Sequence, residues 1–333
     1  MLDFAEHNPK TINKIRQLGD LIHTQMKDLV VDDAPVAVLD FPDIRNCGDS
    51  AIWLGEMAWL RKHFEMVPSY VSRTYDLDVA ELRAAAPEGT IFLHGGGSFG
   101  DIWEGKQDFR DEVLIAFPDR KIVQFPQSIH FQSQDRANQT ARVIEKHRDF
   151  TLLVRDQESE DFAKRNFQCD IRLCPDMAFA IGPVQAKPAT VPVLAMLRED
   201  REKTALGAWN HPDIPREDWI TEDAWKVKLA KLKGTLSAGV ATAAHRKFCR
   251  LDAAANQRFG RGISQISRGK VLVTDRLHVH ICSTLIGRPH AVLDNSYGKI
   301  RRLMDTFYPE GTGLTHRPAS LDEAVAWARA TAA

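Results

Sequence analysis

The feature of this sequence that most constrains its fold is a regular alternation of two kinds of segment. Short apolar runs rich in β-branched residues stop at polar or glycine-rich turns, which is typical of buried strands. Longer segments between them, such as residues 12–29 and 52–64, repeat apolar residues every three or four positions, which is typical of helices. This alternation predicts an α/β protein with parallel, doubly wound sheets. The apolar runs are residues 35–39, 90–93, 121–125, 151–154, 191–197, 270–273 and 290–293.

The length of the chain and a cluster of prolines predict two domains. A chain of 333 residues is long enough for two domains of about 100–200 residues each. Three prolines and several small residues lie within residues 181–192, so we place the boundary there. We expect Rossmann-like α/β domains over residues 1–185 and 190–333. A capping box at Ser320 and Glu323 opens a final helix, whose packing on the second domain or back on the first is left open.

The composition argues against several classes of protein. Hydrophobic residues make up 44% and charged residues 27%, which is ordinary for a globular protein, and a formal net charge of -1 argues against a nucleic-acid partner. The five cysteines include no C-x-x-C pair, so no zinc knuckle or disulfide framework is expected. No apolar run resembles a signal peptide or a membrane span. We expect a cytoplasmic protein, with the inner face of the membrane as an alternative location; a homo-oligomer is compatible with these features.

A first candidate anion site lies at residues 46–52, after the first predicted strand. Asn46 and Asp49 lie there at the start of a helix, and the free N–H groups of a helix N-terminus attract anions. Asp49 or Ser50 is the expected cap of this helix. The alternative is a plain strand-turn-helix cap without a ligand.

A second candidate site is the glycine-rich stretch over residues 95–100, which contains Gly96 and Gly97. It matches the dinucleotide pattern G-x-G-x-x-G literally, but the next strand ends without the carboxylate that a ribose needs. We interpret it as a backbone cradle for an anion, with a tight turn as the alternative. The sequence has no G-x-x-x-x-G-K-[ST] motif, which argues against a P-loop nucleotidase.

Two predicted strands end in arginines that suit phosphate or carboxylate binding. Arg155 follows the run at 151–154, with a surface ion pair to Asp156 or Glu158 as the alternative. Arg276 follows the run at 270–273, and His278 lies two residues later on the first turn of a helix. A permanent cation beside a group that titrates near neutral pH suits phosphoenolpyruvate chemistry. His280 should point elsewhere around that helix and serve packing.

Further polar residues lie at the ligand-facing ends of predicted strands. Lys299 could add charge for a phosphate, and Arg198 is another candidate cation. Asn295 and Gln127 are candidates for binding an acceptor hydroxyl. For each of these residues, a turn or a surface position is the alternative.

Two other groups of residues have both a functional and a structural interpretation. The tryptophans at 209, 219 and 225 could stack on sugars, but helix packing is favoured. A basic cluster could be a solvated face or could touch an anionic lipid-linked substrate or a membrane surface. The cluster consists of Arg246, Lys247, Arg250, Arg258, Arg261 and Arg268.

The order of these motifs resembles that of the polysaccharide pyruvyltransferase family. The resemblance runs from about residue 35 to residue 299, and its most specific part is Thr-Asp-Arg-Leu-His at 274–278. Two features depart from the pattern: Cys47, and the insertion-like stretch 201–233. The motifs are Asn-Cys-Gly-Asp at 46–49, Gly-Gly-Gly at 95–97, Pro-Gln-Ser-Ile at 126–129, Arg-Asp at 155–156, Cys-Pro-Asp at 174–176, Thr-Asp-Arg-Leu-His at 274–278 and Asp-Asn-Ser-Tyr-Gly-Lys at 294–299.

The resemblance implies a two-domain fold similar to GT-B glycosyltransferases, with the active site in the interdomain cleft. It implies phosphoenolpyruvate as donor and co-substrate, no other cofactor, no metal, and a saccharide acceptor in a polysaccharide or its lipid-linked precursor. His278 would transfer a proton, and the two sugar hydroxyls would end in a ketal. The expected donor-binding residues are Arg155, Arg276, Leu277, Gly96, Gly97, Asn46, Asp49 and Lys299, and the expected acceptor-binding residues are Asn295 and Gln127.

Two other functions remain as alternatives at this point. A nucleotide-sugar glycosyltransferase would use the same two-domain fold, and binding of phosphoenolpyruvate rather than a nucleotide sugar separates the two. A non-catalytic saccharide-binding protein would lose no activity when Arg276 and His278 are removed.

Overall fold

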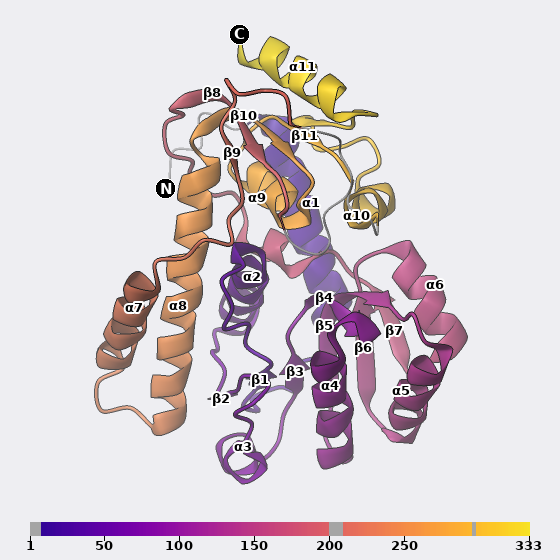
Figure 1. Ribbon diagram of the computed structural model, residues 1–333. Coiled ribbons are helices and arrows are strands. Elements are labelled where there is room, and N and C mark those ends of the chain that lie inside the picture. The colour runs from indigo at the N-terminus through magenta and orange to yellow at the C-terminus, as the bar shows by residue number, and fades with distance from the viewer. Residues whose placement is uncertain (1–7, 200–208, 295–297) are drawn as a thin grey trace.

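The computed structural model describes residues 8–199, 209–294 and 298–333, and it builds them around two parallel sheets (Figure 1). The first sheet has the order β2-β1-β3-β5-β6-β7, and β4 pairs with β5 outside this path. Every pairing within it is parallel. Its strands are β1 (Ala37–Leu39), β2 (Tyr70–Val71), β3 (Ile91–Leu93), β4 (Gly96–Gly100), β5 (Ile122–His130), β6 (Phe150–Val154) and β7 (Asp170–Leu173).

The second sheet is also parallel and has the order β12-β11-β10-β8-β9. In both sheets the chain starts at an inner strand, moves to one edge, and then returns to the other side of the first strand. Open α/β sheets bind ligands where the strand order reverses in this way, at the carboxyl ends of the strands. The strands are β8 (Val191–Met196), β9 (Arg216–Glu217), β10 (Gly269–Thr274), β11 (His290–Val292) and β12 (Thr315–His316).

Helices pack on the faces of both sheets, and several of them join the two domains. The long helix α8 runs down one side of the molecule, with α7 on its outer side (Figure 1). The α-helices are α1 (Pro9–Met26), α2 (Cys47–Phe64), α3 (Val79–Ala85), α4 (Glu104–Ala116), α5 (Gln134–Lys146), α6 (Gln157–Asn166), α7 (Ala224–Ser237), α8 (Ala243–Ile266), α9 (Leu277–Leu285), α10 (Lys299–Phe307) and α11 (Leu321–Ala332). The 3-10 helices are η1 (Asp101–Trp103) and η2 (Met177–Ile181).

The predicted α/β class and all seven predicted strands are confirmed. The sequence did not indicate β2, β9 and β12, because strands of two residues are too short to show a period of their own. It also gave no sign of β4, which is built from glycines and polar residues. Pairing with β5 holds β4 extended, so the expected glycine-rich loop is a short strand.

One hydrophobic core is shared by the two domains. It joins apolar residues on one face of the first sheet, such as Val38 and Val123, to Leu194 and Leu272 of the second, with α2, α8 and α9 between them. Helix α1 belongs to the same core, and Thr11 on it donates to the carbonyl of Thr312 at 2.8 Å. The N-terminal helix therefore holds the second domain as well as the first.

The final helix packs on the second domain and not back on the first. Ser320 caps α11 by accepting from the backbone N–H of Glu323 at 3.2 Å, as the capping box predicts. The apolar side of α11, including Leu321 and Val325, covers the outer face of the second sheet together with Val193 and Val271. The stretch 181–192, where we place the domain boundary, connects η2 to β8.

Glycines allow α2 and α8 to approach their neighbours across the domain interface. A side chain at Gly48 of α2 would lie 2.5 Å from Nδ1 of His278, and one at Gly262 of α8 would lie 2.9 Å from the Cβ of Cys47. These contacts hold the two domains in close packing. In the part of the chain that the structure describes, no helix is long and apolar enough to cross a lipid bilayer.

Candidate active site

A cavity of about 360 Å³ lies where the carboxyl ends of the two sheets face each other. Residues from both domains line it, so a cleft between the domains is present as expected. Most of the lining residues directly follow a strand, which is why residues far apart in sequence meet here. The lining residues that concern us are Asp40, Ile44, Asn46, Asp49, His94, Gly95, Gly97, Ser98, Trp103, Lys106, Arg155, Arg198, Trp219, Ile220, Arg276, Leu277, His278 and Lys299.

Arg155, at the end of β6, is held by a buried network on one wall of the cavity. Its Nε donates to the hydroxyl of Ser128 at 3.0 Å, and its guanidinium is paired with the carboxylate of Asp176. A Cβ at position 97 would lie only 2.8 Å from the other guanidinium nitrogen and 3.5 Å from the Nζ of Lys299. Glycine at 97 therefore lets two cations approach the backbone of β4, and the surface ion pair of Arg155 is not formed.

His278 lies on the first turn of α9, beside the same carboxylate. Its Nε2 lies 3.4 Å from Oδ2 of Asp176, while its ring faces the Cα of Gly48 closely enough that a Cβ there would be 2.5 Å from Nδ1. Burial alone would raise the pKa of Asp176, but the charges of His278 and Arg155 hold that pKa well below its usual value. Asp176 is therefore an ionised residue that orients both a cation and the candidate acid.

Asp176 was not among the predicted site residues, although its motif contributed to the resemblance. It follows β7, and its Oδ1 caps η2 by accepting from the backbone N–H of Ala178 at 2.9 Å. In sequence it is indistinguishable from other helix-capping aspartates. Its position at the end of a strand is the one signal that could have identified it.

Arg276 is a buried cation on the opposite side of the cleft. Its guanidinium donates to Oδ2 of Asp218 at 2.6 Å, and its backbone N–H donates to the hydroxyl of Thr274 at 3.0 Å. The preceding Asp275 accepts from the backbone N–H of Arg198 at 2.8 Å, and burial raises the pKa of this carboxyl. These contacts fix both arginines at the ends of β10 and β8.

Asn46, not Asp49 or Ser50, caps α2. Its side chain accepts from the backbone N–H of Gly48 at 3.1 Å, because the helix begins at Cys47, before the apolar pattern at 52–64. Both Asn46 and Asp49 line the cavity. The N-termini of α2 and α9 both reach this space, and the partial positive charge at each favours an anion there.

Lys299 is the first residue of α10, and it also lines the cavity. Asp294 fixes the start of that helix by accepting from the backbone N–H groups of Ile300 and Arg301 at 3.2 and 3.3 Å. The structure therefore brings together His278, Arg155, Arg276, Leu277, Gly97, Asn46, Asp49 and Lys299 at one cavity.

Gly96 and Gln127 are the predicted site residues that the structure places elsewhere. Gln127 is buried, and its amide is used internally: it accepts from the N–H of Ser98 at 3.0 Å and donates to the carbonyl of His94 at 3.0 Å. Gly96 lies beside it in the β4–β5 register, where a Cβ would face Ile52. Neither residue lines the cavity: Gly97 of β4 faces it, and the neighbouring Gly96 faces the other side of the strand. Asn295 lies outside the described residues.

A buried acid-base pair that the sequence did not reveal lies behind β3. His94 lines the cavity, and its Nδ1 lies 3.0 Å from a carboxylate oxygen of Glu56. The other oxygen of Glu56 accepts from the N–H of Gly95 at 2.8 Å. Complete burial raises the pKa of Glu56, against the opposing effect of His94. This pair can therefore keep a proton beside the cavity.

The mouth of the cavity has an amphipathic rim. Trp103 is 51% exposed, and Ile44 and Ile220 are exposed near it while lining the same space. Lys106 forms an ion pair with Asp40 on the first-domain side. An exposed indole beside charged hydrogen-bonding groups is a surface on which a sugar ring can stack.

The tryptophans of the second domain have different environments, so packing does not explain all of them. Trp219 is buried and lines the cavity, as does the adjacent Ile220. Trp225 is 63% exposed on α7, contrary to the favoured packing role. His280, in contrast, is buried and its Nδ1 lies 2.7 Å from Nε2 of His290, which confirms the packing role. Among the described residues, no group of three or more His, Cys, Asp or Glu side chains could hold a metal ion.

The amino-acid sequence of the chain matches a known protein family over most of its length. Residues 46–297, which include nearly all of the cavity lining, match the family described as polysaccharide pyruvyl transferase. The chain belongs to this family. The protein is therefore a transferase, and the family acts by pyruvyl transfer onto polysaccharide.

Named relatives agree with this assignment, and a solved structure shares the fold. Pyruvyl transferase 1 of Schizosaccharomyces pombe is 30% identical to this transferase over 312 residues, which are 87% of this chain and 73% of that protein. The putative pyruvyl transferase EpsO of Bacillus subtilis is 28% identical over 279 residues, 82% of this chain and 85% of that protein. The crystal structure of an uncharacterized protein from Klebsiella pneumoniae subsp. pneumoniae NTUH-K2044 shares the fold, with a TM-score of 0.56, 16% identity, and coverage of 92% of this chain and 99% of that one.

Proposed function

We propose that the pyruvyl donor is phosphoenolpyruvate and that it binds between Arg155, Lys299 and Arg276. Phosphoenolpyruvate carries a carboxylate and a phosphate on one small carbon skeleton, so it needs several cations at short range. The observation that carries the proposal is the convergence of these three side chains with the N-termini of α2 and α9. Guanidinium groups bind carboxylate and phosphate through paired hydrogen bonds, and helix N-termini add backbone donors.

In this proposal His278 moves the protons of the reaction. Protonated His278 gives its proton to the methylene carbon of the enol phosphate, and one sugar hydroxyl attacks the central carbon and returns its proton to the imidazole. A second hydroxyl of the same sugar then attacks that carbon, and the bond between the carbon and the phosphate oxygen breaks. The proton of the second hydroxyl leaves with the phosphate, so the products are a ketal and inorganic phosphate. Asp176 lies 3.4 Å from Nε2 of His278 and would hold the ring in position.

The rim of the cavity supports a saccharide acceptor. The exposed indole of Trp103 offers a stacking face, and the ion pair of Lys106 and Asp40 offers polar partners for hydroxyl groups. We propose that the acceptor is a polysaccharide or its lipid-linked precursor. Phosphoenolpyruvate serves as co-substrate, and the proposed steps need no further cofactor.

The experiment that tests this function measures donor binding first and product second. Isothermal titration calorimetry with phosphoenolpyruvate should give saturable binding to the wild type, and thermal stability should rise with ligand concentration. Incubation with candidate glycans should then give a carboxyethylidene adduct by mass spectrometry, with an equal amount of released phosphate. Binding of a nucleotide sugar without binding of phosphoenolpyruvate would instead support a glycosyltransferase.

A further inference from the structure

Helix α7 carries a stripe of exposed apolar side chains that no part of the described chain covers. Trp225 is 63% exposed and Leu236 is 70% exposed, and Leu229 and Leu232 between them are also exposed. At about 100° per residue, these four side chains fall within an arc of roughly 60° on one side of the helix. The stripe is therefore a continuous ridge and not a set of scattered surface residues.

The opposite side of α7 is the one that packs on the protein. Val227 is buried, and a side chain at Gly234 would overlap the backbone carbonyl of Cys249 on α8. Both positions lie about half a turn away from the stripe. Because the buried side is fixed to α8, the apolar stripe faces outward at the flank of the molecule, where Figure 1 places α7.

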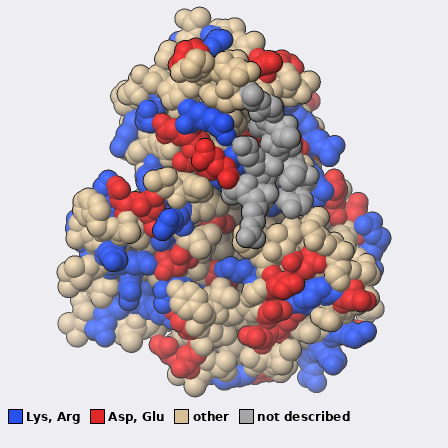
Figure 2. All heavy atoms as spheres, in the orientation of Figure 1, with Lys and Arg blue, Asp and Glu red and all other residues tan. Residues whose placement is uncertain are grey.

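Lysines border the stripe on both sides. On the helical wheel Lys226 and Lys233 lie on one side of it and Lys228 on the other, and all three are exposed. The sequence of α7 contains no acidic residue. The fourth lysine, Lys231, points inward and binds Asp43 at 2.8 Å. Figure 2 shows lysine and arginine atoms gathered on this flank among uncharged ones.

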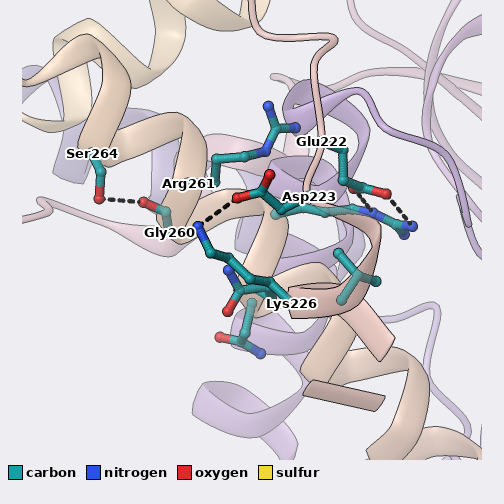
Figure 3. A pocket seen from close by; sticks show the side chains of 10 residues that line it. Glu222, Asp223, Lys226, Gly260, Arg261 and Ser264 are labelled. Carbon is teal, nitrogen blue, oxygen red and sulfur yellow. Dashed lines mark hydrogen bonds and ion pairs between the residues drawn. The ribbon is translucent and has the colours of Figure 1, made fainter. Parts of the chain in front are cut away.

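Several charged side chains on and beside α7 form ion pairs. Figure 3 shows the pocket of about 460 Å³ between α7 and α8, where Asp223 reaches Lys226 and Glu222 pairs with Arg258. Arg261 is also turned inward, toward backbone carbonyls. Of the predicted basic cluster, only Arg246 and Arg250 are exposed, near the turn between α7 and α8. Lys226 is thus paired with Asp223, and the exposed positive charge beside the apolar stripe comes from Lys228 on one side and Lys233 on the other.

We propose that α7 docks on a lipid bilayer that contains anionic headgroups. An apolar ridge with lysines on both sides matches acyl chains below and negative headgroups around it, which is the pattern of helices that lie in the membrane interface. At 14 residues α7 is too short to span the bilayer, so it lies along the surface. Docking of a second copy on the same ridge would bring lysines against lysines, which disfavours that alternative.

The position of α7 links this surface to the cavity. Trp219 and Ile220 line the cavity and directly precede the turn into α7. The ion pair of Lys231 with Asp43 also ties α7 to the loop that carries Ile44 at the cavity mouth. Where the proposed function holds, a bilayer at α7 would present a lipid-linked acceptor close to that mouth. The docking itself is tested without any substrate.

The test is co-sedimentation of the full chain with vesicles of two compositions. One consists of phosphatidylcholine alone, and the other contains about one-third phosphatidylglycerol, which supplies the negative surface potential. The wild type should sediment with the anionic vesicles only, and added salt should weaken the binding by screening. Leu236→Ser should lower binding about tenfold because one apolar contact is lost. Replacing Lys226, Lys228 and Lys233 together by glutamine should lower it about a hundredfold.

The matched control is Ile115→Ser on α4. Ile115 is 66% exposed, close to the value for Leu236, but it lies outside the stripe, so its replacement should leave vesicle binding unchanged. Phosphoenolpyruvate binding should be the same in all variants, which separates this proposal from the proposed function. Failure of the wild type to bind anionic vesicles, or equal binding by Leu236→Ser, would overturn the proposal. So would a dimer in sedimentation velocity that Leu236→Ser abolishes, because the stripe would then belong to a second copy.

Discussion

At the scale of single residues, Asp176 explains why Arg155 and His278 can act together. It is buried between them, accepts from the guanidinium, and lies 3.4 Å from Nε2 of the imidazole. One carboxylate thus partly neutralises a cation and positions the imidazole for which we propose proton transfer. A donor that adds its own negative charges meets two groups whose positions are already fixed, so little ordering is left for the moment of binding.

For His278 we expect a loss of turnover without a loss of folding. His278→Gln removes the proton carrier, so the rate at saturating substrate should fall by about 10²–10⁴. Steady-state phosphate release measures this rate, and the circular dichroism spectrum should be unchanged. His280→Ala is the control: it breaks the buried contact with His290, so it should lower thermal stability and leave turnover of the folded fraction nearly normal. Near-normal turnover in His278→Gln would exclude it as the acid.

For the arginines we expect a loss of donor affinity. Arg155→Ala and Arg276→Ala each remove charge-assisted hydrogen bonds, and phosphoenolpyruvate should bind roughly ten- to a hundredfold more weakly in calorimetry. Lysine at either position should restore only part of the affinity, because a single ammonium cannot form the paired contacts of a guanidinium. Each cation also leaves an aspartate partner behind, so thermal unfolding must be measured for every variant. Unchanged affinity in both alanine variants would place the donor elsewhere.

At the scale of elements, the sequence predicts strands well and contacts between strands poorly. The seven apolar runs form strands because burial on both faces leaves a continuous hydrophobic signal. Arg155 directly follows such a run and Arg276 lies two residues past β10, which is why the sequence could indicate that both lie at the cavity. Gly96 and Gln127 do not line the cavity, and the sequence could not indicate this because β4 has no apolar alternation to show which face a residue takes. His94 and Asp176 act through partners far away in sequence, and such pairs have no local signal.

Asp43 ties the loop after β1 to α7 and α8, and this gives a prediction about acid stability. Its carboxylate binds Lys231 at 2.8 Å and Arg258 at 2.9 Å, and these contacts outweigh burial and lower the pKa of Asp43 to about 2. A carboxyl whose pKa is depressed in the folded state stabilises the protein above its unfolded pKa and loses that effect as the pH falls toward 2. Asp43→Asn should therefore lower the free energy of unfolding by about 2 kcal/mol or more at pH 7.

Urea unfolding of wild type and Asp43→Asn between pH 7 and pH 3 measures this difference. The gap in unfolding free energy should stay constant down to about pH 4 and narrow below it. A suitable control is Asp119→Asn. Asp119 forms an exposed ion pair with Arg83, so its replacement should change the free energy of unfolding little at any pH. A gap for Asp43 that does not change below pH 4 would contradict the assigned role.

At the scale of the whole molecule, buried neutral histidines should make the protein sensitive to mild acid. Burial lowers the pKa of His290 to about 4, and the pKa of His280 is also well below its usual value. Between about pH 6.5 and pH 4 the unfolded chain binds protons at these sites and the folded chain does not, so stability falls as the pH falls. The shifted pKa of His290 alone should make the free energy of unfolding about 2 kcal/mol lower at pH 5 than at pH 7.

Urea unfolding at pH 7, 6 and 5 checks this, with the His290 ring proton followed by NMR. Its resonance should stay that of the neutral form at pH 5 while the midpoint of unfolding moves to lower urea. If the free energy of unfolding is unchanged between pH 7 and pH 5, the histidines are not buried as neutral groups.

The glycine contacts of α2 and α8 have a consequence for recombining this protein with its relatives. Gly48 leaves room for the imidazole of His278, and Gly262 leaves room for the side chain of Cys47, so both glycines serve contacts between the two domains. The close packing of the two domains therefore depends on residues of both, although their sheets are separate. A chimaera spliced within residues 181–192 should fold only when both parents carry small residues at these two positions.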